Sequence, residues 1–154
     1  MTVEVLPVRG LPEIGGGDDL AALIAEAVAL RPGDAVAVTQ KAVSKAEGRV
    51  VPGEKEEWVA RQTRRVVARR ADLLIAETSH GFVCANAGVD QSNVAEGFVS
   101  LLPEDPDGSA ERIGAALRSR TGHDVAVVIT DTFGRPWRRG LVNVAIGSAG
   151  LPSL

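Results

Sequence analysis

Apolar residues recur along this chain at two spacings, and each spacing predicts a different kind of element. Spacings of three and four residues predict amphipathic helices over residues 20–28, 55–70 and 109–120. Short apolar or alternating runs predict strands at residues 3–8, 34–39, 50–51, 73–77, 82–85, 96–102, 125–129 and 141–146. This mixture predicts an α+β or mixed α/β fold, in which a sheet is flanked by helices.

Capping and turn residues set several of the expected boundaries. Asp18 or Asp19 precedes the first helix, where a short carboxylate accepts hydrogen bonds from the free backbone N–H groups of the first turn. We expect residues 40–49 to form a loop after the strand 34–39, and residues 105–108 to form a turn. The helix over 55–70 is expected to have a basic outer face and to pack inward through Trp58, Gln62, Val66 and Val67.

Composition excludes several classes of protein. The chain has 154 residues, 45% of them hydrophobic and 24% charged, which is typical of one soluble globular domain. A net charge of -3 argues against a nucleic-acid binder, which needs a dominant basic face. No apolar run approaches the ~20 residues of a membrane span, and the first residues lack the features of a signal peptide. A cytoplasmic protein without nucleic-acid or membrane partners is expected.

Cysteine and histidine contribute little to the expected chemistry. Cys84 is the one cysteine, which excludes an intramolecular disulfide and a multi-cysteine metal site. Its apolar neighbours predict a small core residue. His80 and His123 lie far in sequence from the acidic segments, so a structural or surface role is expected for both.

Two Gly-containing segments, residues 86–93 and 130–138, are expected to be loops after apolar runs, and each places an acid beside hydroxyl or amide groups. Carboxylate, hydroxyl and carbonyl oxygens are the ligands of hard divalent cations such as Mg²⁺ or Mn²⁺ rather than of zinc. Asp90 and Asp131 are therefore candidate metal ligands, with Thr132 and Asn93 as neutral oxygen donors. The alternative is that each Asp stabilises its own turn through backbone hydrogen bonds.

Basic and glycine-rich segments suggest anion binding. Lys45, with Gln40, Lys41 and Ser44, follows a buried strand and suits a phosphate, although the P-loop pattern is missing and a solvated basic turn is the alternative. Residues 15–17, three glycines before a helix, could bind an anion, although a flexible linker is the more common role of such a run.

Three arginines flank Pro136-Trp137 near the second acidic segment: Arg135, Arg138 and Arg139. The planar guanidinium fork suits a carboxylate or phosphate, so the cluster is a candidate site for an anionic substrate, with an exposed basic hairpin as the alternative. The chain ends in a Gly-rich apolar stretch, residues 147–154, without a cap or charged tail. We interpret that stretch as the end of a fragment.

Four segments together, residues 11–14, 39–49, 86–93 and 131–138, resemble the coenzyme F420-0:γ-glutamyl ligases. The resemblance implies one ligase domain over residues 1–154, incomplete at its C-terminus, with a fold distinct from P-loop and ATP-grasp enzymes. It implies ligation of L-glutamate to coenzyme F420-0, cleavage of GTP to GDP and phosphate, and assistance by Mg²⁺ or Mn²⁺ and by K⁺. It also implies a homodimer and, in some relatives, a fused nitroreductase-like domain.

Carried over residue by residue, the resemblance implies roles for the candidate residues. Asp90 and Asp131 would bind one divalent ion and Thr132 a second. Arg135 and Arg138 would orient the coenzyme or the glutamate, and Lys45 would offset phosphate charge. The implied nucleotide contacts are Leu11, Pro12, Glu13, Ile14, Gln40, Lys41, Lys45 and Asn93.

The implied reaction proceeds through an acyl phosphate, because a free carboxylate does not form an amide at neutral pH. Phosphoryl transfer depends on positioning and charge neutralisation more than on a protein nucleophile, which agrees with the prevalence of acids, lysines and arginines in these segments. Two alternatives remain: a metal- and nucleotide-binding module without turnover, and a structural subunit that dimerises through its apolar strands.

Overall fold

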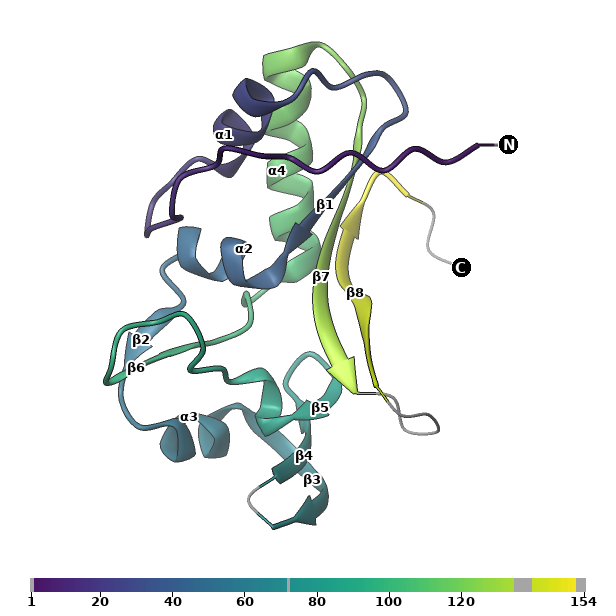
Figure 1. Ribbon diagram of the computed structural model, residues 1–154. Coiled ribbons are helices and arrows are strands. Elements are labelled where there is room, and N and C mark those ends of the chain that lie inside the picture. The colour runs from purple at the N-terminus through teal and green to yellow at the C-terminus, as the bar shows by residue number, and fades with distance from the viewer. Residues whose placement is uncertain (1, 72, 135–139, 152–154) are drawn as a thin grey trace.

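The computed structural model describes residues 2–71, 73–134 and 140–151 (Figure 1). In chain order the elements are α1 (Leu20–Ala27), β1 (Ala35–Thr39), α2 (Gln40–Ala46), β2 (Val50–Pro52), α3 (Lys55–Gln62), β3 (Thr63–Arg70), β4 (Leu73–Thr78), β5 (Val83–Ala85), the 3-10 helix η1 (Asn86–Gly88), β6 (Phe98–Ser100), α4 (Pro106–Thr121), β7 (Ala126–Gly134) and β8 (Leu141–Ala149). This mixture of helices and strands confirms the α+β, or mixed α/β, fold class. Within the described residues, no helix is both long and apolar enough to cross a membrane.

The main sheet has the strand order β1-β7-β8. Strand β1 runs parallel to β7, with Thr39 opposite Thr130, and β8 returns antiparallel to β7. Helix α4 packs against β7, β8 and α1. The interior between the sheet and these helices is apolar, and its buried residues include Leu20, Ile24, Val36, Val38, Leu117, Val127, Ile129 and Ile146. The helices predicted at 20–28 and 109–120 and the strands at 34–39 and 125–129 are therefore confirmed.

A second group of elements lies at the lower end of the main sheet in Figure 1. Strands β3, β4 and β5 form an antiparallel sheet in that order, and β2 pairs with β6. These elements have their own core, made of Val59, Leu74, Ala76, Ala87, Val89, Val99 and Leu101. Strand β5 also contacts β7, so the second group lies beside the part of β7 that carries Asp131.

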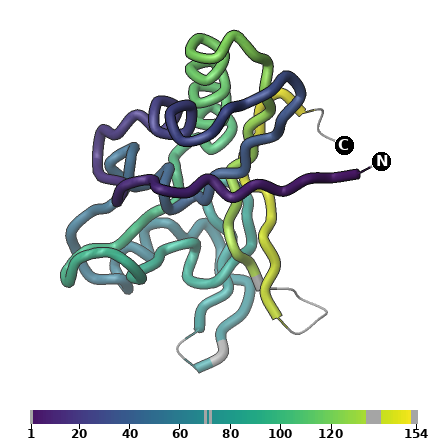
Figure 2. Tube along the Cα trace, turned by 45° about the horizontal axis from the view of Figure 1, so that its top comes forward, coloured from purple at the N-terminus to yellow at the C-terminus, as the bar shows by residue number. Residues whose placement is uncertain are grey.

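The N-terminal strand prediction is wrong. Residues 3–8 form an extended segment without strand pairing to the rest of the described chain, and Figure 2 shows this purple segment crossing the molecule. Val3 and Val5 are 76% and 86% exposed. Alternation of apolar residues predicts a strand only where a neighbouring strand supplies hydrogen-bond partners and a face to bury, and here neither is present among the described residues.

The helix predicted over residues 55–70 is shorter than expected. Helix α3 ends at Gln62, and the chain continues as strand β3, where Val66 and Val67 are 50% and 45% exposed instead of buried. Arg65 lies opposite Glu77 of β4, and the Arg65 guanidinium donates to a Glu77 carboxylate oxygen at 2.7 Å. Pairing with the next strand along the chain, together with β-branched residues, outweighs the helical spacing.

Two segments expected to be irregular are helical instead. Residues 40–46 form α2, because Oγ1 of Thr39 accepts a hydrogen bond from the backbone N–H of Ala42 at the helix start. The predicted turn at 105–108 is the first turn of α4, where Asp105 is the N-cap and Pro106 takes the first helical position. Asp19, one of the two residues predicted to cap the first helix, is the N-cap of α1.

Candidate functional site

The site begins where β1 ends beside its parallel partner β7. Strand β1 leads directly into α2, so Gln40 and Lys41 occupy the first positions of that helix. Strand β7 continues past Thr130, and Asp131 and Thr132 are therefore strand residues paired with Val144 and Asn143 of β8. The expectation that Asp131 lies in a loop is wrong, because β8 supplies a partner for this part of the chain.

Asp90 approaches this edge from the second group of elements. Its backbone is fixed to β6, since the Asp90 N–H donates to the Ser100 carbonyl at 3.0 Å and the Ser100 N–H donates to the Asp90 carbonyl at 2.7 Å. The Asp90 carboxylate accepts hydrogen bonds from the backbone N–H and the hydroxyl of Ser92, at 2.9 and 2.6 Å. Asp90 thus stabilises its own turn, as the alternative interpretation predicted, and still presents its carboxylate to the site.

Lys41 neutralises this carboxylate. Its ammonium nitrogen lies 2.6 Å from Oδ2 of Asp90 and donates to Oγ of Ser92 at 2.6 Å. Burial acts to raise the pKa of Asp90, but the hydrogen bonds from Lys41 and Ser92 together outweigh it, and the pKa lies below its usual value. Asp90 is therefore a carboxylate held in its ionised form by a cation.

Asp131 has the opposite electrostatic environment. Burial raises its pKa, and the negative charge of Asp90 acts in the same direction. Hydrogen bonds from the Thr132 backbone N–H and the Gln40 side chain act against this rise without cancelling it. Burial, followed by the charge of Asp131, also raises the pKa of the nearby Cys84 thiol to about 11. The negative charge of Asp90 thus disfavours the ionised form of Asp131, which is the condition that a shared divalent cation would relieve.

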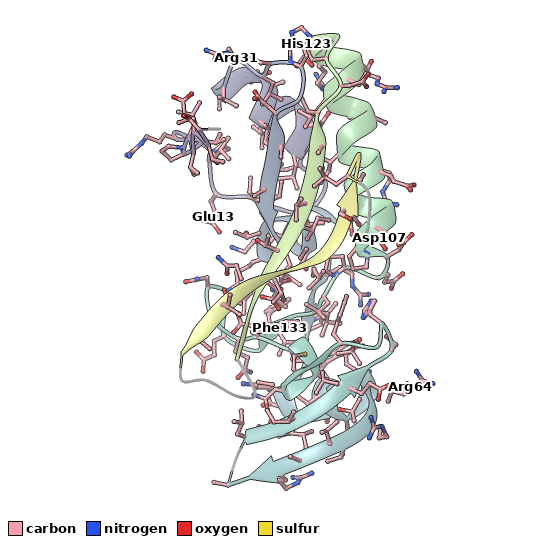
Figure 3. All side chains as sticks on the ribbon, turned by 90° about the vertical axis from the view of Figure 1, so that its right-hand side faces the viewer. Glu13, Arg31, Arg64, Asp107, His123 and Phe133 are labelled. Carbon is pink, nitrogen blue, oxygen red and sulfur yellow. The ribbon has the colours of Figure 1, made fainter. Side chains whose placement is uncertain are left out.

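Both carboxylates line one cavity of about 1120 Å³ between the main sheet and the second group of elements. Its polar lining comes from the ends of β1 and β7, the start of α2 and the loop after η1, and includes Gln40, Lys41, Asp90, Ser92, Asp131 and Thr132. Oγ1 of Thr132 donates to Oδ1 of Asn143 at 2.8 Å. The apolar part of the lining comes from β4, β5, β7 and β8, and Figure 3 shows Phe133 at this junction.

A second, smaller cavity of about 380 Å³ contains the other predicted nucleotide contacts Glu13, Ile14, Lys45 and Asn93, together with Gly15 and Gly16. The Lys45 ammonium forms an ion pair with the Glu13 carboxylate. The glycine segment is fixed to the end of α2, because the Gly17 N–H donates to the Ala46 carbonyl at 2.8 Å. Leu11 and Pro12, the other two predicted contacts, line neither cavity.

The two cavities share two structural elements. Lys41 and Lys45 are four residues apart on α2, which places them on the same face of the helix one turn from each other. The loop of residues 90–95 supplies Asp90 and Ser92 to the larger cavity and Asn93 to the smaller one. An elongated ligand that follows α2 and this loop would reach both cavities.

The donor set fits a magnesium-type cation. Within the described residues, no group of three or more His, Cys, Asp and Glu side chains could hold a metal ion. Mg²⁺, however, is usually held by one or two carboxylates, with water and substrate phosphates completing its octahedral shell. Asp90 and Asp131 provide two carboxylates, and Thr132 a neutral hydroxyl, in one cavity.

The remaining predicted residues divide into three groups. Arg135, Arg138 and Arg139 lie outside the described residues. Neither histidine lines the larger cavity: Nε2 of His80 lies 3.0 Å from the Glu104 carbonyl oxygen, and Figure 3 shows His123 at the end of the molecule far from Phe133. Cys84 is buried, as predicted, but also lines the larger cavity. Lys55, Ser92 and Asn143 line it too and were not predicted.

Comparison with known proteins identifies the family to which this chain belongs. Residues 10–55 and 52–154 match the family described as "F420-0:Gamma-glutamyl ligase". The chain belongs to this family, which confirms the resemblance based on the four segments. The two matched ranges meet at the start of α3.

Three relatives, each named coenzyme F420:L-glutamate ligase, illustrate the similarity. The relative from Methanothermobacter thermautotrophicus is 40% identical, over 98% of this chain and 70% of its own length. The relative from Methanopyrus kandleri is 43% identical, over 99% of this chain and 69% of its own. The relative from Archaeoglobus fulgidus is 41% identical, over 100% of this chain and 70% of its own. The first alignment runs over 176 residues, more than the 154 of this chain, so that relative has residues without a counterpart here.

Proposed function

We propose that this protein acts in coenzyme F420 biosynthesis as a GTP-dependent ligase that joins L-glutamate to coenzyme F420-0 through an amide bond. Family membership and the names of the relatives support the reaction class. One observation of the structure carries the proposal further: the carboxylates of Asp90 and Asp131, from segments far apart in sequence, line one cavity and influence each other electrostatically. A pair of this kind is suited to hold a divalent cation against phosphate oxygens.

The proposed reaction activates the F420-0 carboxylate as an acyl phosphate, which the amine of glutamate then attacks. The γ-phosphoryl group of GTP moves to a carboxylate oxygen, GDP leaves, and attack by the amine releases phosphate as the amide forms. Mg²⁺ or Mn²⁺ would supply charge neutralisation at the phosphates. Asp90 and Asp131 would hold that ion and Thr132 a second one. Lys41, once released from Asp90, would offset the charge of the phosphate oxygens.

The nucleotide is proposed to lie along α2 and the loop of residues 90–95, with Gln40 and Lys41 beside the phosphates. Lys45 and Asn93 would contact it from the smaller cavity, which Glu13 and Ile14 also line. Lys45 must exchange its ion pair with Glu13 for one with a phosphate. Contacts by Leu11 and Pro12, a K⁺ ion and a homodimeric assembly are proposed from the family resemblance alone.

A direct test incubates the 154-residue chain with F420-0, L-glutamate, GTP and Mn²⁺ or Mg²⁺. We expect a product heavier than F420-0 by one glutamyl residue, formed together with GDP and phosphate, and no product when the metal or glutamate is omitted. Calorimetric titration with GDP in the presence of Mn²⁺ separates the alternatives. Metal-dependent GDP binding without product would favour a nucleotide-binding module, and the absence of binding would favour a structural role.

A further inference from the structure

Lys55 contributes to the same cavity as the two carboxylates. It is the first residue of α3, it is half-buried, and it lines the 1120 Å³ cavity. Its sequence position alone predicts a solvated side chain on the outer face of a helix. Both ranges matched by the family model include this lysine, since they overlap at residues 52–55.

The charge of Lys55 is available for a ligand. Of the two lysines that line this cavity among the described residues, Lys41 is paired with Asp90. Lys55 forms no salt bridge with any carboxylate in the described part of the chain. An unpaired ammonium in a partly enclosed site attracts anions more strongly than one on an open surface, because less water screens it.

An apolar wall occupies another part of the lining. It consists of Leu73 and Ile75 of β4, Val83 of β5, Phe133 of β7 and Leu141 of β8. Leu73, Val83 and Leu141 are 43%, 49% and 70% exposed, so much of this apolar surface is in contact with water. A ligand with a flat apolar ring system would remove that surface from water, which is the favourable direction of the hydrophobic effect.

The size of the cavity allows two ligands side by side. Sites for single drug-sized ligands occupy about 300–1,000 Å³, whereas this cavity measures about 1120 Å³ and a second cavity of about 380 Å³ adjoins α2. The phosphates of a nucleotide beside Asp90 and Asp131 would leave the apolar wall free. The cavity is therefore large enough for a phosphoryl donor and its acceptor together.

We propose that Lys55 and the apolar wall form the subsite for the acceptor, an aromatic heterocycle that carries anionic groups. The ring system packs on the wall and one anionic group pairs with Lys55, while the carboxylate that reacts lies toward Asp131. Glutamate is also anionic but has no ring to cover the wall, so the wall favours the acceptor. This inference rests on the proposed ligase function, in which F420-0 is the acceptor.

The test compares Lys55→Met with Arg69→Met. The first variant removes the charge from the cavity and keeps a chain of similar length. The second removes the same charge from an exposed position on β3 that does not line the cavity. Calorimetric titrations measure F420-0 binding and, separately, GDP binding in the presence of Mn²⁺, and steady-state assays give KM for glutamate. Val83→Asp, on an exposed part of the wall, is the second probe.

We expect Lys55→Met to weaken F420-0 binding by about tenfold or more, the effect of losing one charge-assisted hydrogen bond. Val83→Asp should weaken it by a similar factor, because a carboxylate on the wall repels an anionic ligand and interrupts the apolar surface that the ring would cover. In both variants the GDP affinity should stay within about twofold of its original value. Arg69→Met should change neither the F420-0 affinity nor the GDP affinity. Unchanged F420-0 affinity in Lys55→Met would overturn the inference, as would a loss confined to GDP or to glutamate. If the unaltered chain binds GDP with Mn²⁺ but not F420-0, the acceptor subsite is overturned and the nucleotide site stands. If it binds neither, the proposed function fails as well.

Discussion

The ammonium nitrogen of Lys41 lies 2.6 Å from Oδ2 of Asp90, and both side chains line the larger cavity. A lysine thus occupies part of the space around a carboxylate that we propose binds a divalent ion. The two side chains are 25% and 37% exposed, so water screens the pair only in part. Lys41 and a metal ion compete for the same oxygen.

Lys41→Met should therefore strengthen Mn²⁺ binding in the absence of nucleotide. We expect an increase of about two- to fivefold, the range of a partly exposed ion pair, and weaker GDP binding because a phosphate loses its cation. Titration with Mn²⁺ alone and then with GDP measures both effects. Lys45→Met, which removes a lysine paired with Glu13, is the control for Mn²⁺ binding. Weaker Mn²⁺ binding in Lys41→Met would mean that the lysine supports the cation site.

Asp131→Ala should abolish metal-dependent GDP binding and leave the fold intact. The change removes a carboxylate from the cavity without removing core volume, so the free energy of unfolding should change by less than about 1 kcal/mol. Titration with GDP and Mn²⁺, together with urea unfolding in a chelator, separates the two effects. Glu111→Ala, on the exposed face of α4, is the matched control. Intact GDP binding in Asp131→Ala would show that this carboxylate holds no metal.

Glu13→Gln and Lys45→Ala should change GDP affinity in opposite directions. Glu13 is 85% exposed and its ion pair with Lys45 contributes little to folding, but it occupies the lysine that a phosphate would use. Glu13→Gln is expected to raise GDP affinity by about two- to fivefold, and Lys45→Ala to lower it. The measurement is GDP titration at constant Mn²⁺. If both variants bind GDP more weakly, the Glu13 side chain contacts the nucleotide directly.

The stability of α1 should depend on pH through Asp19. A hydrogen bond from the Ala22 backbone N–H, and then one from Arg120, lowers the pKa of Asp19 below 3.8. A lowered pKa means that the ionised carboxylate stabilises the folded state above pH 3.8, and this contribution disappears as pH falls through the folded-state pKa. Asp19→Asn keeps the cap but loses the charge. The urea midpoint of Asp19→Asn should therefore lie below that of the unaltered chain at neutral pH, and this difference should vanish in acid. Glu111→Gln should show no such pH-dependent difference.

Gly88→Ala should destabilise the protein more than Gly81→Ala. Both glycines have positive φ, +75° and +87°, but a Cβ on Gly88 would lie 2.7 Å from Leu102, and one on Gly81 would meet nothing within 4 Å. Both variants incur backbone strain of about 1–2 kcal/mol. Gly88→Ala adds about 1–3 kcal/mol of overpacking and should shift Asp90, which follows η1. Urea unfolding and Mn²⁺ titration test the two effects, and equal unfolding free energies would mean that Leu102 yields without cost.

Local signals in the sequence predicted the main sheet and two of its helices. The cap at Asp19 and the apolar run 125–129 depend on neighbours within a few residues, and the structure confirms both. The strand β3 was missed because its apolar residues also fit a helical spacing, and its pairing with the next strand β4, as in Arg65 with Glu77, decides between the two. Helix α2 was missed although Thr39, a good N-cap residue, stands immediately before it.

For the site too, the sequence indicated candidate residues but not how the fold brings them together. Residue types alone suggested Asp90 and Asp131 as metal ligands, but only the family resemblance brought them together. Their common cavity results from the bridge between Asp90 and Ser100 and from the parallel pairing of β1 with β7, which joins segments far apart in sequence. Lys55 lies in that cavity because α3 packs on η1, and its neighbours in sequence give no sign of this.

Both lysines of α2 already have acidic partners, Lys41 with Asp90 and Lys45 with Glu13. Binding of a nucleotide with its divalent ion would then replace one set of ion pairs by another. Each lysine would leave a carboxylate for a phosphate, and Asp90 would leave a lysine for the metal ion. The number of opposite-charge contacts hardly changes in such an exchange. Added salt should accordingly weaken the binding of a metal–nucleotide complex only slightly, in contrast to its strong effect where a phosphate meets bare cations.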